Sequence, residues 1–325
     1  MELIDRMLAG DQRALARLIT LVENRRPEMT AIMEKVYDLA GRARVIGVTG
    51  PPGAGKSTLV DQLAAAYRAA GKTMGIVAID PSSPFSGGAL LGDRVRMMRH
   101  AADAGVFIRS LGSRGSHGGL SRATREVVRL LDAAGFDIVL VETVGVGQTE
   151  LGIMEVAHSV VVALVPESGD VIQTMKAGLT EIADLFVVNK ADRDGADRLA
   201  LELRRTVEIA GRPGWQPPVL LTVAFKGAGV PELAAALDRH YAQAAAEGRY
   251  DHRREDASVA EFAEIIVDEI AVRLRGGAAV NDFATLVAGV RAGRVNPYLA
   301  ALQVLRNPAV LKDLFAGEAP KAGKA

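Results

Sequence analysis

The sequence "RVIGVTGPPGAGKSTLV", residues 44–60, gives the strongest indication of the fold. It opens with a short apolar run, typical of a buried strand, and closes on the start of a helical pattern. Between the two, "GPPGAGKST" at residues 50–58 fits the pattern G-x-x-x-x-G-K-[ST]. Glycines there let backbone N–H groups approach phosphate oxygens, and the helix N-terminus adds its dipole. We predict a phosphate-binding loop; the alternative is a Gly/Pro turn that binds nothing.

Six residues of this loop are the predicted phosphate contacts. Lys56 is expected to neutralise the β- and γ-phosphates of a nucleotide, which makes it a candidate catalytic residue, and the Ser57 hydroxyl is expected to ligate Mg²⁺. The predicted set is Gly53, Ala54, Gly55, Lys56, Ser57 and Thr58.

Short apolar runs alternate with helical patterns from Arg44 onwards. Each run is apolar throughout instead of alternating with polar residues, which favours a parallel sheet buried on both faces. We therefore expect an α/β fold with a mostly parallel central sheet flanked by helices, and a ligand site at the carboxyl ends of the strands. The runs are "RVIGVTG", "TMGIVAID", "GVFIRS", "DIVLVET", "SVVVALVP", "DLFVVNKAD" and "PVLLTVA".

The two ends of the chain have a different pattern. Residues 1–42 show helical periodicity and predict an N-terminal helical extension, whereas residues 43–248 hold the α/β pattern. Residues 249–325 predict a C-terminal helical arm, and the charged segment "GRYDHRREDAS" at residues 248–258, where the arm begins, is expected to be a linker. The apolar faces of the arm could pack on the sheet domain or against another subunit.

The composition narrows the class of protein. Lys and Arg total 39, as do Asp and Glu, so the net charge of zero creates no global field that favours nucleic acid or an anionic membrane. The absence of cysteine excludes disulfides and thiolate metal sites. The N-terminus lacks the apolar core of a signal peptide, and no run reaches the ~18 apolar residues of a membrane span, so we expect a cytoplasmic protein.

The tetrapeptide "NKAD", residues 189–192, follows the apolar run "LFVV" and resembles the guanine motif N-K-x-D of nucleotide-binding proteins. Asp192 would accept hydrogen bonds from the N1 and N2 donors of guanine, which adenine does not offer. Asn189 would bond the other edge of the base, and the stem of Lys190 would lie over the ring. Ala224 resembles the small residue that proteins with this guanine motif place after the next strand, whose backbone N–H contacts the guanine O6. The alternative is a solvated turn.

Several segments together resemble the methylmalonyl-CoA mutase-associated GTPases, the MeaB/ArgK family, which are P-loop GTPases of the metallochaperone-like class. The resemblance runs in order from about Arg44 to Ala224, with one departure at His117, where an apolar residue is more usual. The segments are "GVTGPPGAGKSTLVDQL", "IDPSSPFSGGALLGDRVRM", "SRGSHGGLS", "DIVLVETVGVGQTE", "PESGDVIQTMKAGLTEIAD" and "VVNKAD".

This resemblance implies a homodimeric enzyme that hydrolyses GTP to GDP and phosphate with the help of Mg²⁺. It further implies a chaperone that gates adenosylcobalamin loading and protects its partner, an adenosylcobalamin-dependent acyl-CoA mutase of the methylmalonyl-CoA mutase type. The partner would handle the cobalamin, because this chain has no D-x-H-x-x-G motif. The flanking helices resemble the family's N-terminal extension and C-terminal dimerisation arm.

The resemblance also assigns residues to the metal and to a switch. Asp80, Asp93 and Glu142 would surround Mg²⁺ together with Ser57, and Glu142 is a second candidate catalytic residue. The alternatives are a turn-initiating role for Asp80, a solvated loop position for Asp93 and a structural role for Glu142. Lys176 would couple the nucleotide state to the mutase, as a third catalytic candidate, unless it is an ordinary surface lysine.

No residue stands out as a general base or arginine finger, since phosphoryl transfer needs positioning and charge stabilisation more than covalent chemistry. Gln148 could orient water, and Arg109 and Arg114 are further candidates with surface roles as the alternative. Two other functions compete. A metallochaperone GTPase would need a Cys or His cluster, which this sequence lacks. A P-loop small-molecule kinase would often prefer ATP, against which the "NKAD" motif argues.

Overall fold

The computed structural model describes residues 2–80, 98–100, 102–112, 122–143, 151–167, 180–211, 214–275 and 282–309. The chain divides into two compact units, Met1–Tyr250 and Asp251–Ala325. The first unit holds the sheet and the helices around it, and the second holds most of one long helix and two shorter ones.

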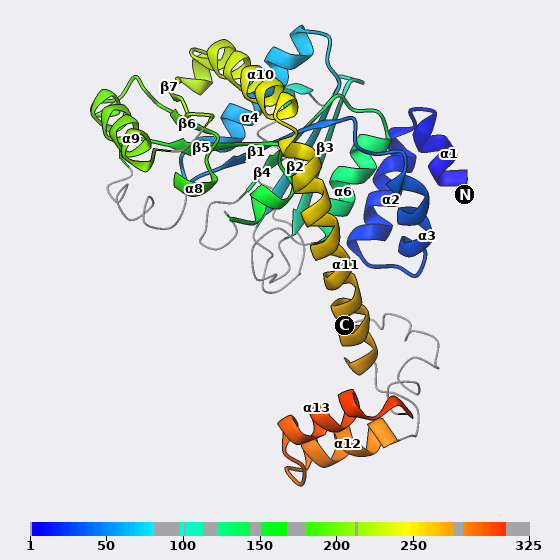
Figure 1. The fold of residues 1–325 in the computed structure, drawn as a ribbon. Helices are drawn as coiled ribbons and strands as arrows, with labels where there is room; N and C mark the ends of the chain where they lie inside the picture. Colours follow the sequence, from blue (N-terminus) through cyan, green and yellow to red (C-terminus); the bar gives the residue numbers. More distant parts are fainter. Residues whose placement is uncertain are drawn as a thin grey trace. The chain divides into compact units, whose positions relative to one another are not determined.

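A parallel sheet forms the centre of the first unit (Figure 1). In the described part of the chain it has seven strands in the order β3-β2-β4-β1-β5-β6-β7, and each of their pairings is parallel. The predicted α/β fold with a parallel central sheet is therefore confirmed. The strands are β1 (Arg44–Thr49), β2 (Met74–Asp80), β3 (Val106–Gly112), β4 (Ile138–Glu142), β5 (Ser159–Leu164), β6 (Leu185–Val188) and β7 (Val219–Leu221).

Helices cover both faces of the sheet, which explains why its strands are apolar throughout. Successive residues of a strand point to opposite faces, so Val45 and Ile46 enter two different cores. Helices α4 (Lys56–Ala69) and α10 (Val230–Ala246) complete the core that contains Ile46. Helices α6 (Arg122–Ala133) and α9 (Ala196–Ala210), with the short η3 (Leu151–Glu155), complete the core that contains Val45.

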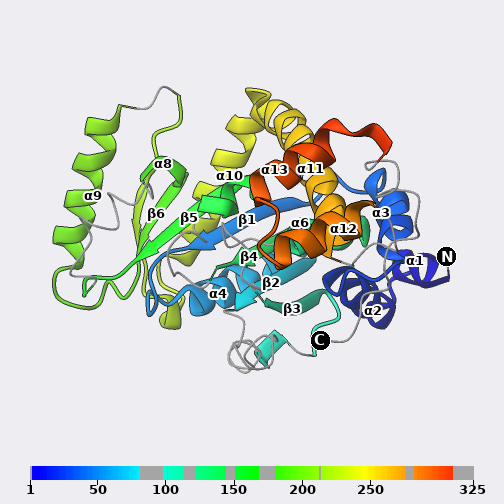
Figure 2. The same cartoon turned by 90° about the horizontal axis from the view of Figure 1, so that it is seen from below.

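The N-terminal helices extend the core that contains Val45. They are α1 (Glu2–Leu8), α2 (Gln12–Glu23) and α3 (Met29–Tyr37), and α2 and α3 pack against α6 (Figure 2). The apolar face of α2 includes Leu15 and Ile19, which are buried in the same cluster as the strands. Asp11 caps α2 by accepting hydrogen bonds from two of its first backbone N–H groups.

The second unit is helical. Helix α11 (Arg249–Arg275) begins in the first unit, and α12 (Asp282–Arg291) packs on α13 (Pro297–Arg306) through Phe283 and Val304. The linker predicted at residues 248–258 is wrong, because helix α11 begins at Arg249. Arg, Glu and Ala are good helix formers, and after Gly248 the segment contains neither glycine nor proline to interrupt them.

None of the described helices is both long enough and apolar enough to cross a membrane. The short remaining helical elements of the described chain are η1 (Met98–His100), α8 (Thr180–Ile182) and η5 (Ala224–Lys226).

Candidate nucleotide site

The predicted site residues meet at the carboxyl ends of neighbouring strands. The loop of residues 50–55 follows β1 and leads into α4, and Glu142 ends β4, where it pairs with Val48 of β1. Asn189 follows β6, two strands away on the other side of β1. In a parallel sheet this edge is where ligands bind, and the topology brings the distant motifs together there.

Two glycines of the loop are required by their surroundings. Gly50 has a φ of +136°, and a Cβ atom on it would lie 2.0 Å from the carbonyl oxygen of Ala163 in β5. Gly55 has a φ of +82°, and a Cβ atom on it would lie 2.4 Å from the side-chain nitrogen of Asn189. Both positions combine a left-handed backbone with a close neighbour, so only glycine fits them.

Lys56 begins helix α4 and its side chain is buried. The Nζ atom donates hydrogen bonds to the carbonyl oxygens of Gly50, at 2.8 Å, and Pro51, at 3.0 Å. The ammonium group is thus folded over the loop that it follows. A phosphate group bound in the loop would compete with these two carbonyls for the Nζ protons.

Ser57 and Glu142 are in direct contact. The Ser57 hydroxyl donates a hydrogen bond of 2.6 Å to Oε1 of Glu142, and both residues are buried. Beside them, Thr143 donates a 2.8 Å hydrogen bond to the hydroxyl of Thr49 at the end of β1. A hydroxyl and a carboxylate on a strand end are the hard oxygen donors that Mg²⁺ prefers, so these two residues fit the predicted metal site.

The other predicted metal ligands are less completely described. Asp80 ends β2, opposite Gly112 of β3, but its side chain lies outside the described residues, as does the whole of Asp93. Within the described residues there is no group of three or more His, Cys, Asp or Glu side chains that could hold a metal ion. Ser57 and Glu142 are therefore the part of the predicted metal site that can be examined directly.

Asn189 is a buried link between three segments. Its Nδ2 donates to the carbonyl oxygen of Ala54 at 2.9 Å, and its Oδ1 accepts from the Thr222 hydroxyl at 3.1 Å and the Ala224 N–H at 3.0 Å. The prediction gave the Asn189 side chain and the Ala224 N–H to the guanine base. In this structure they bind each other, and Asn189 joins the phosphate loop to the turn after β7.

Asp192 and Lys190 lie on the surface next to this link. Lys190 has a φ of +56°, a left-handed conformation that is uncommon for residues other than glycine. Asp192 is about one-third exposed, and one of its oxygens, Oδ2, lies 3.9 Å from Nζ of Lys226. The contact with Lys226 was not predicted, because a lysine in a turn carries no signal until the fold brings it to Asp192.

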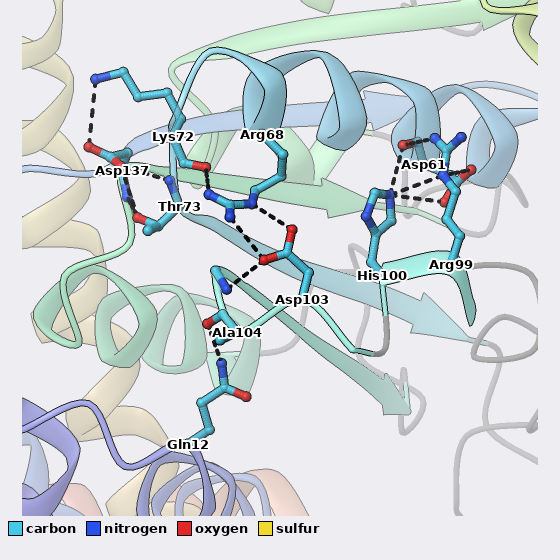
Figure 3. Close-up of polar contacts among 11 residues, drawn as sticks. Gln12, Asp61, Arg68, Lys72, Thr73, Arg99, His100, Asp103, Ala104 and Asp137 are labelled. Atoms are coloured by element: carbon cyan, nitrogen blue, oxygen red, sulfur yellow. Dashed lines mark hydrogen bonds and ion pairs between the residues drawn. The ribbon is translucent and has the colours of Figure 1, made fainter.

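Helix α4 carries two further polar clusters beyond the loop (Figure 3). Asp61, one turn after Ser57, bonds both neighbours in η1: its Oδ2 lies 2.8 Å from Nε of Arg99, and its Oδ1 lies 3.2 Å from Nε2 of His100. Near the end of α4, Arg68 donates two hydrogen bonds to Asp103, at 2.8 and 2.9 Å. The Arg68 guanidinium lowers the pKa of the Asp103 carboxyl below its usual value of 3.8. These contacts fasten η1 and the turn before β3 to the helix that begins at Lys56.

Besides Asp93, three predicted functional residues lie outside the described part of the chain: Lys176, Gln148 and Arg114. His117, where the sequence departs from the family pattern, lies outside it too. Arg109 is described, in the middle of β3, where its guanidinium bonds Glu23 at 2.6 Å and Thr20 at 3.2 Å. Both partners belong to α2, so in this structure Arg109 ties the N-terminal helices to the edge of the sheet.

The parallel sheet, the glycine loop that opens α4, and the Asn189 link to the turn after β7 define the class: a P-loop nucleotide-binding protein. The family model for "Methylmalonyl Co-A mutase-associated GTPase MeaB" matches residues 15–279. The chain belongs to this MeaB family of GTPases. It accordingly binds GTP and GDP and hydrolyses GTP.

Relatives that cover most of the chain agree with this family. The chain is 47% identical over 309 residues to a protein of Pyrococcus abyssi whose name describes it as a GTPase. The match covers 94% of this chain and 95% of that protein. It is 37% identical over 267 residues to GTPase ArgK of Escherichia coli, with 79% of this chain and 81% of that protein covered. A solved structure described as an LAO/AO transport system kinase is 30% identical, with a TM-score of 0.69 over 94% of this chain and 96% of that one.

Proposed function

We propose that this GTPase is a chaperone for an adenosylcobalamin-dependent acyl-CoA mutase of the methylmalonyl-CoA mutase type. The support is the description of the family, which names an association with that mutase. In this proposal GTP binding and hydrolysis gate the loading of adenosylcobalamin and protect the mutase from inactivation. Lys176, in the segment after β5, couples the nucleotide state to the partner.

The observation that carries the chemistry is the buried contact between Ser57 and Glu142, which places two oxygen donors 2.6 Å apart beside the phosphate loop. We propose that these residues hold Mg²⁺, with Asp80 and Asp93 completing the set. The bound metal would neutralise charge on the phosphates. Lys56 exchanges its two loop carbonyls for phosphate oxygens, and the backbone N–H groups from Gly53 to Thr58 orient them.

For recognition of the base, we propose that Asp192 accepts from the N1 and N2 donors of guanine and that the stem of Lys190 covers the ring. Asn189 contributes by holding the loop at Ala54 and the turn at Ala224 in a fixed relation. A base that lacks these donors would leave the Asp192 carboxylate without a match, which is the physical basis of selection against adenine.

We further propose three functional parts: an N-terminal extension in residues 1–42, the GTPase domain in residues 43–248 and a dimerisation arm in residues 249–325. The support for a homodimer is the apolar side of α11. Val259, Phe262 and Ile266 recur at helical spacing and are 70%, 64% and 44% exposed. A row of exposed apolar side chains of this kind marks an interaction surface.

Association with purified adenosylcobalamin-dependent mutases tests the chaperone proposal. The protein, loaded either with GDP or with a non-hydrolysable GTP analogue, is mixed with each mutase, and the complex is measured by pull-down. We expect one nucleotide state to bind a mutase more strongly than the other. A protein that binds none of them in either state would not be a mutase chaperone.

A small-molecule kinase is the second candidate, because the solved structure with 30% identity bears a kinase title. Competition between nucleotides distinguishes the two functions. For a GTPase that serves as a chaperone, we expect that GDP displaces a labelled guanine nucleotide and that ADP does not. Tighter binding of ATP than of GTP, together with phosphoryl transfer to a small acceptor, would support the kinase.

A further inference from the structure

Two threonine hydroxyls meet at the carboxyl ends of β1 and β4. The Thr143 hydroxyl donates a 2.8 Å hydrogen bond to the hydroxyl of Thr49, and the Thr143 N–H donates to the carbonyl oxygen of Val48 at 3.1 Å. Both threonines are buried. Thr49 is the last residue of β1 before the phosphate loop, and Thr143 directly follows Glu142, the last residue of β4. The threonine pair therefore joins the two strand ends that carry the proposed metal site.

The threonine pair lies on the face of the sheet opposite the contact between Ser57 and Glu142. Val48 belongs to the core that α4 helps to complete, and side chains alternate along a strand, so Thr49 points to the other face. Ser57 belongs to α4, and Glu142 meets it on the α4 side of the sheet. One polar contact therefore holds the end of β4 from each face.

The two contacts differ in what a metal ion would do to them. An ion held by Ser57 and Glu142 would take a lone pair of the hydroxyl, and the carboxylate would bind the ion or one of its waters, so this contact takes part in metal binding. The threonine pair contains no group of the proposed metal site, so it holds the strand end with or without the ion. Such a tie matters because Glu142 is the last residue of β4 that pairs with β1, and the ends of elements open most easily.

We propose that Thr49 and Thr143 are positioning residues that hold Glu142 in place for the metal ion. This inference rests on the proposed role of Glu142 at the metal site and adds the groups that fix its position. In this role neither threonine touches the ion. The pair acts through the backbone, since Thr143 shares a peptide bond with Glu142, and loss of either hydroxyl lets the end of β4 move relative to the phosphate loop.

Binding of Mn²⁺ to the complex of the full chain with a non-hydrolysable GTP analogue tests this role, with protein in excess over nucleotide. Mn²⁺ accepts the same oxygen donors as Mg²⁺, and electron paramagnetic resonance separates bound from free ions. Thr143→Val keeps the shape of the side chain and removes the hydroxyl. We expect it to weaken Mn²⁺ binding by roughly tenfold, the lower end of the range for groups that orient a metal ligand. Thr143→Ser retains a hydroxyl and should bind Mn²⁺ nearly as the parent does.

A double-mutant cycle separates positioning from stability. Thr49→Val and Thr143→Val each leave one buried hydroxyl without its partner, whereas the double variant removes both hydroxyls. The midpoint of thermal unfolding without nucleotide should therefore fall in the single variants and recover in part in the double variant. The affinity for Mn²⁺ should not recover, because the bond is absent from all three. If a single variant fails to fold, the double variant supplies the comparison with the parent.

Two controls belong to this experiment. The Thr206 hydroxyl donates to the carbonyl oxygen of Glu202 within α9, at 2.9 Å, so Thr206→Val should leave Mn²⁺ binding unchanged. Binding of GDP in the presence of a metal chelator should be similar in the parent and the threonine variants, because Lys56 and the backbone N–H groups of the phosphate loop do not depend on the ion.

Two results would overturn the proposal, and each points to a different cause. If the threonine variants bind Mn²⁺ as tightly as the parent, or if the affinity recovers with stability in the double variant, the pair is structural and does not position Glu142. If Glu142→Gln binds Mn²⁺ as tightly as the parent, Glu142 is not at the metal site and the proposed site itself is wrong.

Discussion

At the scale of single residues, Glu142 illustrates how a strand end becomes a functional position. Four apolar residues precede it in β4, so burial of its carboxylate needs a partner, and the Ser57 hydroxyl supplies one. The apolar run and the acid are both visible in the sequence, which made this position predictable. The partner was predictable too, because the phosphate-loop motif fixes where its serine stands.

Glu142→Gln should preserve the shape of this contact and remove the charge. We expect kcat to fall by a factor on the order of a hundred and the Mg²⁺ concentration needed for half-maximal hydrolysis to rise. Titration of GTP hydrolysis with Mg²⁺ checks this. Glu155→Gln, at the exposed carboxylate that pairs with Arg125, is the control and should behave as the unsubstituted protein. An unaltered Mg²⁺ requirement in Glu142→Gln would exclude Glu142 from the metal site.

Asn189→Ala should destabilise the fold as well as nucleotide binding. The substitution removes three buried hydrogen bonds and leaves the Thr222 hydroxyl and the Ala224 N–H without their acceptor. We expect a loss of about 2–3 kcal/mol in the free energy of unfolding. Thermal or denaturant unfolding without nucleotide measures it, with Asn24→Ala at an exposed helix end as the control. If Asn189 acted on the base alone, unfolding without nucleotide would be unchanged.

At the scale of elements, α4 connects the phosphate loop to the opposite end of the sheet. Its first residues, Lys56 and Ser57, belong to the site, and its last turn carries Arg68, which holds Asp103 in the turn before β3. Between them Asp61 holds η1. The helix was predictable from the motif and its apolar spacing. These polar ties were not, because their partners lie 35 to 39 positions away along the chain.

Arg68→Met should lower stability in a way that depends on pH. Because Arg68 lowers the pKa of folded Asp103 below 3.8, the pair stabilises the folded state above that value, where the unfolded carboxyl is also ionised. This contribution is lost as the pH falls below 3.8 through the folded pKa. The difference in unfolding free energy between variant and parent should therefore shrink from pH 7 to pH 3. Denaturant unfolding at both pH values measures it. An equal difference at both would show that the ion pair with Asp103 does not contribute, and that Arg68 acts through packing or its hydrogen bond to the carbonyl oxygen of Lys72.

The N-terminal part of α11 shows where pattern-based prediction failed. Residues 248–258 are charged and were predicted to be a linker, but a composition of that kind is also common on exposed helices. The aromatic contacts of Tyr250 decide the outcome: its ring stacks on Tyr241 at 5.1 Å and meets His158 edge-on at 4.8 Å. Those contacts join the root of α11 to α10 and to the start of β5, which local sequence patterns do not reveal.

At the scale of the whole molecule, we expect two copies of the chain to form a dimer. The first unit of the chain has two buried cores, whereas the second unit has a small one and a row of exposed apolar side chains on α11. A row of that kind is stabilised when another copy of the chain covers it. The expected dimer therefore depends on the second unit more than on the first.

Phe262→Asp should weaken or abolish the dimer, because it places a charge in the centre of the exposed apolar row. Light scattering coupled to size exclusion should show a dimer for the parent and a monomer for the variant at micromolar concentration. Ile209→Asp is the matched control, since Ile209 is 86% exposed on α9 in the first unit. Equal masses for Phe262→Asp and the parent would place the interface elsewhere.

If nucleotide hydrolysis by this GTPase serves a mutase partner, GTP turnover should differ with and without that partner. The rate of phosphate release from GTP is measured for the purified protein alone, with an adenosylcobalamin-dependent acyl-CoA mutase, and with bovine serum albumin as a control. We expect slow turnover by the protein alone, since no arginine finger or general base is found among the described residues at the site, and a marked acceleration by the mutase. Rapid turnover by the isolated protein, with no change when the mutase is added, would contradict it.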